Sequence, residues 1–251
     1  YSNPNLSPGT EAIAKNNTYP TALVMVFKLA GDNFDVPAAM AQLVLEHHRA
    51  KGVAIHLGRT VASLDETAGE AVLDDGQRVP AALVVVGIGV VANDELAARA
   101  GIACDDGIFV DAFGRTTLPD VFAAGVVTRQ RHPVSGRFER IETWSNAQGQ
   151  AQALAAYLCN PATAKPFDLV PWFWSDQYDL KLQIAGLNAG YDEVLLSGDP
   201  SRDRDFSCFY FRDRELIAAD CVNRPRDFMF SKRAISQQLR VDRSELLAGS
   251  I

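Results

Sequence analysis

Short apolar runs alternate along the chain with longer stretches of helical periodicity. Residues 22–27 form an apolar run of strand length, and residues 38–51 carry apolar side chains at helical spacing, with Gly52 suited to end a helix. Residues 83–87 are apolar throughout, a pattern typical of strands buried on both faces of a parallel sheet. The order of these elements predicts an α/β fold.

The middle of the chain predicts several short elements and one long helix. Strands are expected over residues 53–57, 60–65, 70–73 and 107–110, a short helix over 94–100, and a short strand ending at Gly125. A polar, arginine-rich loop is expected from there to Arg140. The helical pattern over residues 141–159 is the longest, and Ser145 with Gln148 fits a capping box, which predicts that the helix begins at residues 143–145.

The two ends of the chain differ from this middle part. Residues 1–20 are rich in Asn, Pro, Ser and Gly and have no apolar period, so we expect an irregular tail. After a boundary near residues 161–166, the pattern predicts alternating strands over residues 181–187, 193–197, 206–211 and 216–222, and a helix over 225–239. These last elements predict a separate small α+β domain.

Composition excludes several classes of function. The net charge is −7, whereas nucleic acid and membrane surfaces attract basic proteins, so neither is expected as a partner. The longest apolar stretch, residues 83–92, is about half of the ~20 residues that a membrane-spanning helix needs, and no signal peptide is recognised. We therefore expect a cytoplasmic protein. The four cysteines form no CxxC pair, which argues against a redox dithiol or a zinc site.

A glycine-rich loop follows the apolar strand at residues 83–87. Residues 87–92, GIGVVA, match a dinucleotide fingerprint, in which glycine lets the backbone approach a pyrophosphate at a helix N-terminus. The context disagrees, because Val90 and Val91 prolong the strand and the acidic pair Asp94-Glu95 would repel a phosphate. An independent NAD-dependent dehydrogenase built on this loop is the least favoured interpretation.

Several longer motifs carry a resemblance to a known family. They are VVGIGVVAN at 85–93, DAFGRTTLPDVFAAG at 111–125, WSNA at 144–147, PWFWSDQY at 171–178 and AGL at 185–187. Together they resemble the FAD-dependent, NAD(P)H-oxidising ferredoxin reductases of bacterial oxygenase and cytochrome P450 systems. The resemblance implies that electrons pass from NAD(P)H through FAD to an iron–sulfur ferredoxin.

The resemblance also implies a domain layout. Residues 21–92 would be a remnant of the NAD(P)-binding domain, 93–163 the returning part of the FAD-binding domain, and 164–251 the C-terminal α+β reductase domain. The fold class would be α/β, a partial pyridine nucleotide oxidoreductase-like region followed by that domain. The chain starts at Tyr1 and lacks the family's GxGxxG loops, so we expect a fragment truncated on its N-terminal side. The alternative is a non-catalytic remnant that acts only through packing or partner binding of its C-terminal domain.

Two loops are expected near the cofactors by this resemblance. Gly87, Ile88 and Gly89 would cross back from the NAD domain and lie beside NAD(P). Gly125 precedes the position at which the family has an aspartate that accepts a hydrogen bond from the flavin ribityl chain. This sequence has Val126 there, which cannot accept the bond.

The beginning of the long helix is the third segment expected to lie near a cofactor. The positive end of a helix dipole suits the negative charge of a reduced flavin, and the resemblance places Trp144 at that edge. Glu142 would bind the nicotinamide carboxamide, or would simply favour the helix dipole from the first turn. Trp174 would cover the flavin, whereas Trp144 has ordinary core packing as its alternative. Hydride transfer needs positioning, so no catalytic acid, base or nucleophile is named.

Two sets of basic residues are weaker candidates for a functional site. His47 and His48 could suggest a metal, but adjacent side chains diverge on a helix, and a solvated helix end is the favoured interpretation; no metal is expected. A cluster of basic residues either steers an acidic ferredoxin or forms a solvated loop. Its members are Arg129, Arg131, Arg137 and Arg140.

Overall fold

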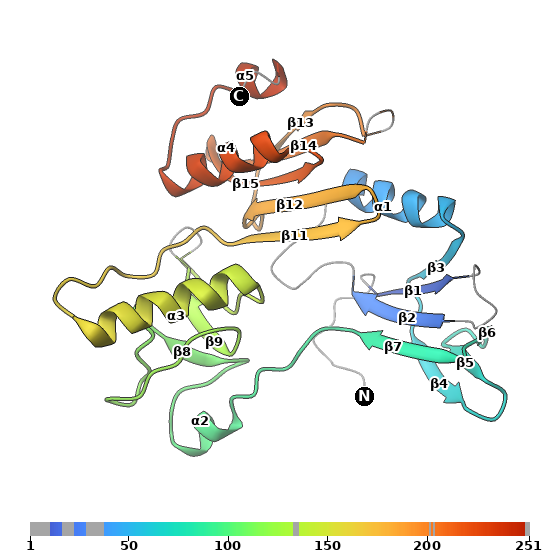
Figure 1. Cartoon of the computed structure of the whole chain (residues 1–251), viewed down its shortest axis with the longest axis horizontal. Helices are drawn as coiled ribbons and strands as arrows, with labels where there is room; N and C mark the ends of the chain where they lie inside the picture. Colours follow the sequence, from blue (N-terminus) through green and yellow to red (C-terminus); the bar gives the residue numbers. More distant parts are fainter. Residues whose placement is uncertain are drawn as a thin grey trace. The chain divides into compact units, whose positions relative to one another are not determined.

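The computed structural model describes residues 11–16, 23–28, 38–132, 136–200, 202 and 204–248, with side chains from Met40 onward (Figure 1). The chain divides into two compact units, Tyr1–Val90 and Val91–Ile251, and each is described by itself.

The first unit contains two small sheets and one helix. Its four-stranded sheet has the order β3-β1-β2-β7, from strands Glu11–Asn16 (β1), Leu23–Lys28 (β2), Val53–Leu57 (β3) and Leu83–Gly87 (β7). β7 pairs with β2 in parallel, and the other pairs are antiparallel. Helix α1 (Ala38–Ala50) contacts β3. The second sheet is an antiparallel meander of β4 (Val61–Asp65), β5 (Glu70–Leu73) and β6 (Arg78–Pro80).

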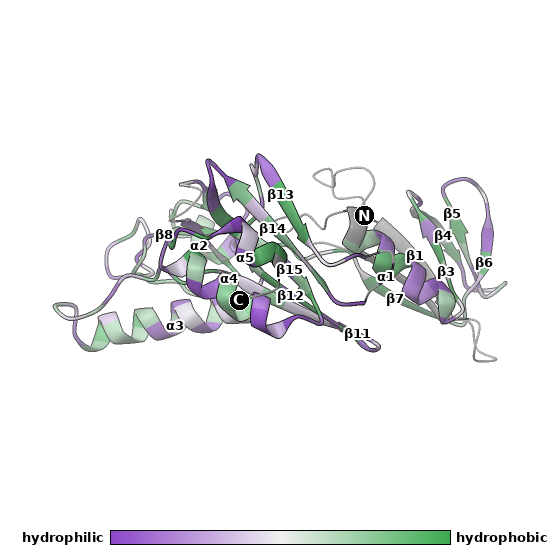
Figure 2. Cartoon of the chain, turned by 90° about the horizontal axis from the view of Figure 1, so that it is seen from above, coloured by the Kyte–Doolittle hydropathy of each residue, from purple (hydrophilic) through white to green (hydrophobic). Residues whose placement is uncertain are grey.

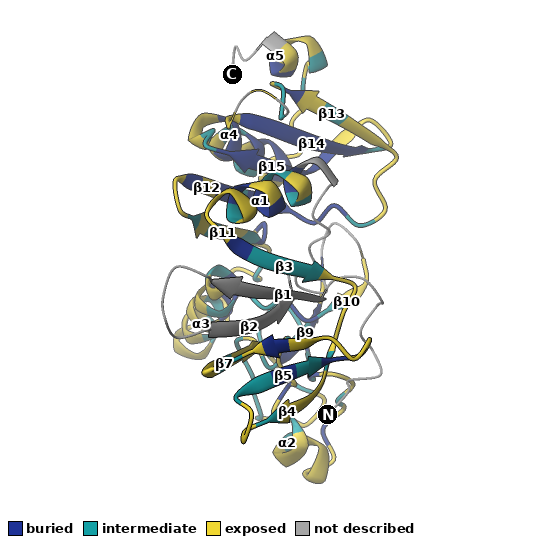
Figure 3. Ribbon diagram, turned by 90° about the vertical axis from the view of Figure 1, so that its right-hand side faces the viewer, coloured by how far each residue is buried: buried dark blue, intermediate teal, exposed yellow. Residues whose placement is uncertain are grey.

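Three expectations for this unit are wrong. Residues 11–16, expected in an irregular tail, form β1 between β2 and β3. The strand Leu83–Gly87 is not buried on both faces, because it pairs on one side only and its Leu83 and Val86 side chains are 58% and 63% exposed (Figure 3). His47, expected at a solvated helix end, is buried, since it lies seven residues after Met40 on the apolar face of α1.

The second unit begins with irregular chain around a small sheet. Helix α2 (Glu95–Arg99) is followed by β8 (Ile108–Val110), β9 (Thr128–Arg131) and β10 (Phe138–Glu139), in the sheet order β10-β9-β8. Two expectations fail here. The arginine-rich segment, expected as a loop, supplies β9 and β10, and the short strand expected before Gly125 is reduced to one bridge between Arg115 and Phe122. Helix α3 (Trp144–Cys159) then follows.

The rest of the second unit is an antiparallel sheet of five strands in the order β11-β12-β15-β14-β13. The strands are Trp172–Gln177 (β11), Leu180–Gly186 (β12), Glu193–Ser197 (β13), Phe206–Arg212 (β14) and Glu215–Val222 (β15). Helix α4 (Pro225–Ser236) packs on β12 and β15, and the short α5 (Arg243–Ala248) contacts β13. Figure 2 shows hydrophilic and hydrophobic residues on the same helix α4, as expected for an amphipathic helix over a sheet.

The core of this domain lies between the sheet and α4. Phe209, Phe211 and Cys221 are buried there against Phe228 of α4. Figure 3 shows β12 and β14 largely buried. β12, which pairs with β11 at one edge of the sheet, is buried at five of its seven residues.

Candidate functional site

The N-terminus of α3 is closed by a side-chain cap. Thr143 has extended backbone angles, and its hydroxyl accepts a hydrogen bond from the Asn146 N–H at 3.1 Å. The predicted start of the helix at residues 143–145 is confirmed, but the capping residue is Thr143 and not Ser145. The first two helical N–H groups, those of Trp144 and Ser145, have no acceptor within the helix and carry the positive end of its dipole.

The side chain of Ser145 points to a different element. Its hydroxyl donates to the main-chain oxygen of Trp172 at 2.9 Å and therefore connects α3 to β11. The antiparallel pairing of β11 with β12 fixes the strand that receives this bond.

An exposed aromatic pair lies at this junction. The Trp144 ring meets Trp174 edge to face, with ring centroids 6.4 Å apart and planes at 87°. Trp144 is 61% exposed and Trp174 is 44% exposed, so the alternative of ordinary core packing for Trp144 is wrong. Two neighbouring indoles with this much exposed surface form an apolar, flat-sided contact area.

Trp172 is the member of the aromatic cluster that packs into the domain. Its ring lies 5.3 Å from that of Trp174 and 5.9 Å from that of Phe228. The Lys232 ammonium lies over its ring, 4.6 Å from the centroid, in a cation–π contact. The cluster thus extends from the core to the exposed pair.

The loop at Gly125 is attached to α3 by buried polar groups. Gly125 has a φ of +98°, its N–H donates to the Gln150 Oε1 at 2.8 Å, and its carbonyl accepts from the Thr128 hydroxyl at 2.8 Å. The Thr128 hydroxyl oxygen also lies 2.7 Å from Gln150 Oε1, within reach of its single proton, so one α3 side chain contacts both residues. Val126 is 36% exposed, and an isopropyl group stands where a hydrogen-bond acceptor was expected.

Glu142 precedes the helix cap and is held by an ion pair. Its carboxylate lies 2.7 Å from the Arg140 guanidinium, which also pairs with Asp106 at 3.3 Å. Glu142 is therefore not a first-turn carboxylate, and its partner orients it. The Arg140 side chain is only 6% exposed, so it belongs neither to a solvated loop nor to an exposed steering patch.

The predicted residues Gly87, Ile88 and Gly89 lie in the first unit. Gly89 has a φ of +100°, and Ile88 packs against the small core of β5 and β6. The next helix begins only at Glu95, so the loop does not open a helix as a dinucleotide fingerprint would. The structure therefore gathers Trp144 and Trp174, with Gly125 and Glu142 on segments adjoining α3, in the second unit.

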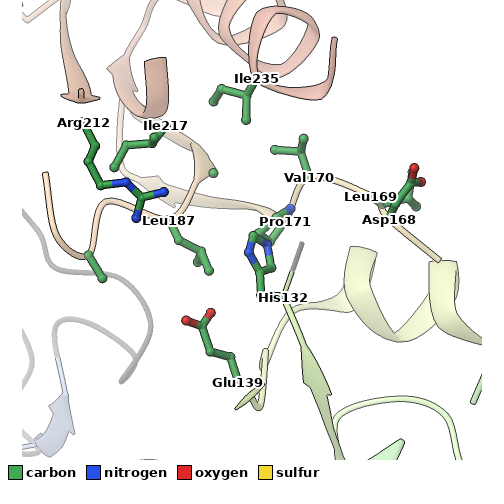
Figure 4. A pocket seen from close by; sticks show the side chains of 12 residues that line it. His132, Glu139, Asp168, Leu169, Val170, Pro171, Leu187, Arg212, Ile217 and Ile235 are labelled. Carbon is green, nitrogen blue, oxygen red and sulfur yellow. The ribbon is translucent and has the colours of Figure 1, made fainter. Parts of the chain in front are cut away.

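Two hollows of the second unit are lined by none of the residues predicted to bind a cofactor. A groove of ≈870 Å³ runs along the 109–122 segment and is lined by Phe109, Arg115 and Tyr157 among others. Figure 4 shows a much smaller cavity, of ≈20 Å³, beside His132, Glu139 and Leu187. This volume is enough for about one water molecule. Burial lowers the pKa of His132, while the charge of Glu139 raises it.

Metal and thiol chemistry find little support in the described part of the chain. Among those residues, no group of three His, Cys, Asp or Glu side chains could hold a metal ion. Helices of the described ranges are too short and too polar to cross a membrane. All four cysteines are free, and burial raises the pKa of Cys208 to about 12, so this thiol stays protonated.

Comparisons with known proteins agree with the motifs. Residues 24–151 match the model of the pyridine nucleotide-disulphide oxidoreductases, and residues 172–250 match the Reductase C-terminal model. Putidaredoxin reductase of Pseudomonas putida is 39% identical over 213 residues, which cover 82% of this chain and 50% of that protein. Rhodocoxin reductase of Rhodococcus erythropolis is 37% identical, covering 76% of this chain and 45% of that protein.

A solved structure shows similarity to the same group of reductases. The crystal structure of the covalent putidaredoxin reductase–putidaredoxin complex has a TM-score of 0.79 and 33% identity, covering 87% of this chain and 55% of that chain. The chain spans about half the length of the relatives it matches. It belongs to the pyridine nucleotide-disulphide oxidoreductase family, and it carries that family's Reductase C-terminal domain, as the motifs predicted.

Proposed function

We propose that this chain forms the flavin-facing and C-terminal part of an FAD-dependent NAD(P)H:ferredoxin reductase. Such an enzyme passes electrons from NAD(P)H through FAD to an iron–sulfur ferredoxin of an oxygenase or P450 system, in the cytoplasm. The exposed Trp144–Trp174 pair at the N-terminus of α3 carries the proposal. The family membership and the names of the relatives support it.

The aromatic pair and the helix end suit a planar ring that becomes negatively charged. The two indoles offer an apolar surface, and the N–H groups of Trp144 and Ser145 lie at the positive end of α3. Bound FAD would supply the conversion of a two-electron hydride donor into one-electron transfers. The residues of this chain would cover the ring and exclude water from it.

Val126 fits the cofactor less well. It offers no acceptor to a ribityl hydroxyl, and a buried hydroxyl without a partner costs about 1 to 3 kcal/mol. This cost corresponds to about a tenfold to hundredfold loss in affinity. The φ of Gly125 still allows close approach of a ligand to the backbone, so the loop is compatible with FAD but binds it more weakly.

The donor side involves two further predicted elements. We infer that Glu142, held by Arg140, accepts a hydrogen bond from the nicotinamide carboxamide. Gly87, Ile88 and Gly89 would lie beside the rest of NAD(P).

The experiment supplies the other half of a relative in trans. The full chain is co-expressed with the amino-terminal half of putidaredoxin reductase, and the purified material is assayed for flavin absorbance and for NADH-dependent reduction of a ferredoxin. We expect a yellow complex that reduces the ferredoxin. Trp144→Ala should release flavin, whereas Phe138→Ala, which alters another exposed aromatic ring, should not.

Two results would overturn the proposal. A complex that stays colourless with added FAD would favour a non-catalytic remnant. Tight NADH binding by the chain without any flavin would favour an independent dehydrogenase.

A further inference from the structure

We propose that Ser145 is a positioning residue that sets the angle between the two exposed indoles, Trp144 and Trp174. The inference rests on the proposed function, because the angle matters only if the pair covers a flavin ring. It concerns the Ser145 hydroxyl, which bonds within the chain and not to a cofactor. Its evidence is a set of hydrogen bonds at the beginning of α3.

These hydrogen bonds run in one direction. The Asn146 N–H donates to the Thr143 hydroxyl at 3.1 Å, and the Thr143 and Ser145 hydroxyl oxygens lie 3.2 Å apart. The Ser145 hydroxyl uses its proton for the main-chain oxygen of Trp172 at 2.9 Å, so Thr143 is the donor between the two hydroxyls. The hydrogen bonds that begin at the cap of α3 therefore extend to the backbone of β11.

The position of Ser145 gives this bond its effect on the rings. Ser145 is the neighbour of Trp144, and its acceptor lies two residues before Trp174 on the same strand. The two elements also meet at the Trp144 and Trp174 rings, but the backbone of α3 is fixed by the bond of Gln150 to the Gly125 loop and that of β11 by its pairing with β12. The Ser145 hydroxyl therefore connects the backbone segments that carry the two rings.

A purely structural role for Ser145 predicts something different. The residue that caps α3 is Thr143, whose acceptor bond does not need the Ser145 side chain. Loss of the Ser145 hydroxyl should therefore leave the helix capped and folded, while the strand loses its hydrogen bond to α3. The change should appear in the ring geometry and not in the helix content.

The tryptophan indole N–H signals in a ¹H–¹⁵N NMR spectrum measure this geometry. The chain has three tryptophans, and all belong to this cluster, so each signal reports on it. Trp→Phe variants assign the signals, and Trp174→Phe shows where the Trp144 signal lies without its neighbour's ring current. The spectra are recorded on the full chain with no flavin added.

We expect Ser145→Ala to move the Trp144 signal at least half of the way to its position in Trp174→Phe. Ser145→Thr keeps the hydroxyl and should keep the wild-type position. The matched control is Ser175→Ala, because the Ser175 hydroxyl accepts its bond from Gln177 within β11 and does not reach α3. If Ser145→Ala does not fold, the isosteric pair Ser145→Thr and Ser145→Val gives the same comparison.

An unmoved Trp144 signal in Ser145→Ala, or in the Val variant, would refute the positioning role. A Trp174→Phe variant that leaves the Trp144 signal in place would refute the ring contact itself. Flavin binding by the co-expressed complex is a separate measurement. If the wild-type complex binds flavin and Ser145→Ala binds it equally well, this inference is refuted and the proposed function stands. If the wild-type complex binds no flavin, the proposed function is refuted, and the NMR signals still show whether Ser145 sets the ring angle.

Discussion

Replacing the buried acid Asp220 by asparagine should change how the stability of the second unit depends on pH. Asp220 is 1% exposed, and its carboxylate accepts a hydrogen bond from the Tyr210 hydroxyl at 2.7 Å. Burial raises its pKa from 3.8 to about 7, while the bond from Tyr210 acts in the opposite direction. Asparagine keeps an acceptor for Tyr210 but cannot ionise.

The direction of the pH dependence follows from proton binding by Asp220. The folded pKa of Asp220 lies above the unfolded value, so the folded chain binds more protons between the two values, and stability falls as the pH rises through this range. A difference of about three pKa units corresponds to about 4 kcal/mol at most. The loss is small below about pH 4 and complete above about pH 7.

Urea unfolding followed by tryptophan fluorescence measures this effect in the second unit, where all three tryptophans lie. We expect the stability of Asp220→Asn relative to the wild type to increase by about 2 to 3 kcal/mol between about pH 5 and pH 8. Asp227→Asn is the control, because this carboxylate is bonded to Ser207 and lies 3.5 Å from Arg224. It should destabilise at both pH values. A pH-independent difference for Asp220→Asn would refute the reasoning.

Three further predictions concern single positions. Val126→Asp in the co-expressed complex should tighten flavin binding about tenfold to hundredfold, and equal dissociation constants would contradict the missing-acceptor argument. Gly186→Ala should lower the thermal midpoint of the second unit sharply, because the φ is +76° and the new Cβ would clash with the main chain of β15; an unchanged midpoint would disprove the clash. In the native protein, iodoacetamide with mass spectrometry should find Cys159 modified and the buried Cys208 and Cys221 protected until unfolding, and modification of all three at one rate would contradict their burial.

The parts of the fold that depend on local sequence could be predicted well. The start of α3 and four of the five strands of the C-terminal sheet follow from the cap residue and from alternating or continuous apolar runs. The fifth strand, β11, was not predicted, because the mixed aromatic and polar run at Trp172–Gln177 has no clear alternation. Burial of a strand was less predictable, since it depends on what covers the strand. The run at Leu83–Gly87 has the composition of a central strand, yet it lies at an edge with β2 as its partner.

Long-range contacts explain what the sequence did not reveal at the site. Trp144 and Trp174 were each named by resemblance, but they lie thirty residues apart in sequence, and their contact depends on how a helix and a strand pack together. Arg140 looked like one of several surface arginines, but it is buried and pairs with Asp106 and Glu142, two contacts that its local sequence does not reveal. The Ser145–Trp172 bond has no sequence signature, because any serine at the start of a helix is first interpreted as part of its cap.

The exposed indoles and Val126 act in opposite directions on flavin binding, and their magnitudes decide the result. At 61% and 44% exposure, Trp144 and Trp174 together present about 250 Å² of surface. Covering about half of it with a flavin ring contributes about 3 kcal/mol, which offsets the about 1 to 3 kcal/mol lost without an acceptor at position 126. The co-expressed complex should therefore bind FAD despite Val126, and Trp144→Ala, which removes the larger share of this area, should weaken binding by about 2 kcal/mol. This loss is comparable in size to the gain of about 1 to 3 kcal/mol expected for Val126→Asp. Equilibrium titration of both variants checks this balance, and a Trp144→Ala complex with wild-type affinity would show that the exposed pair does not contact the flavin.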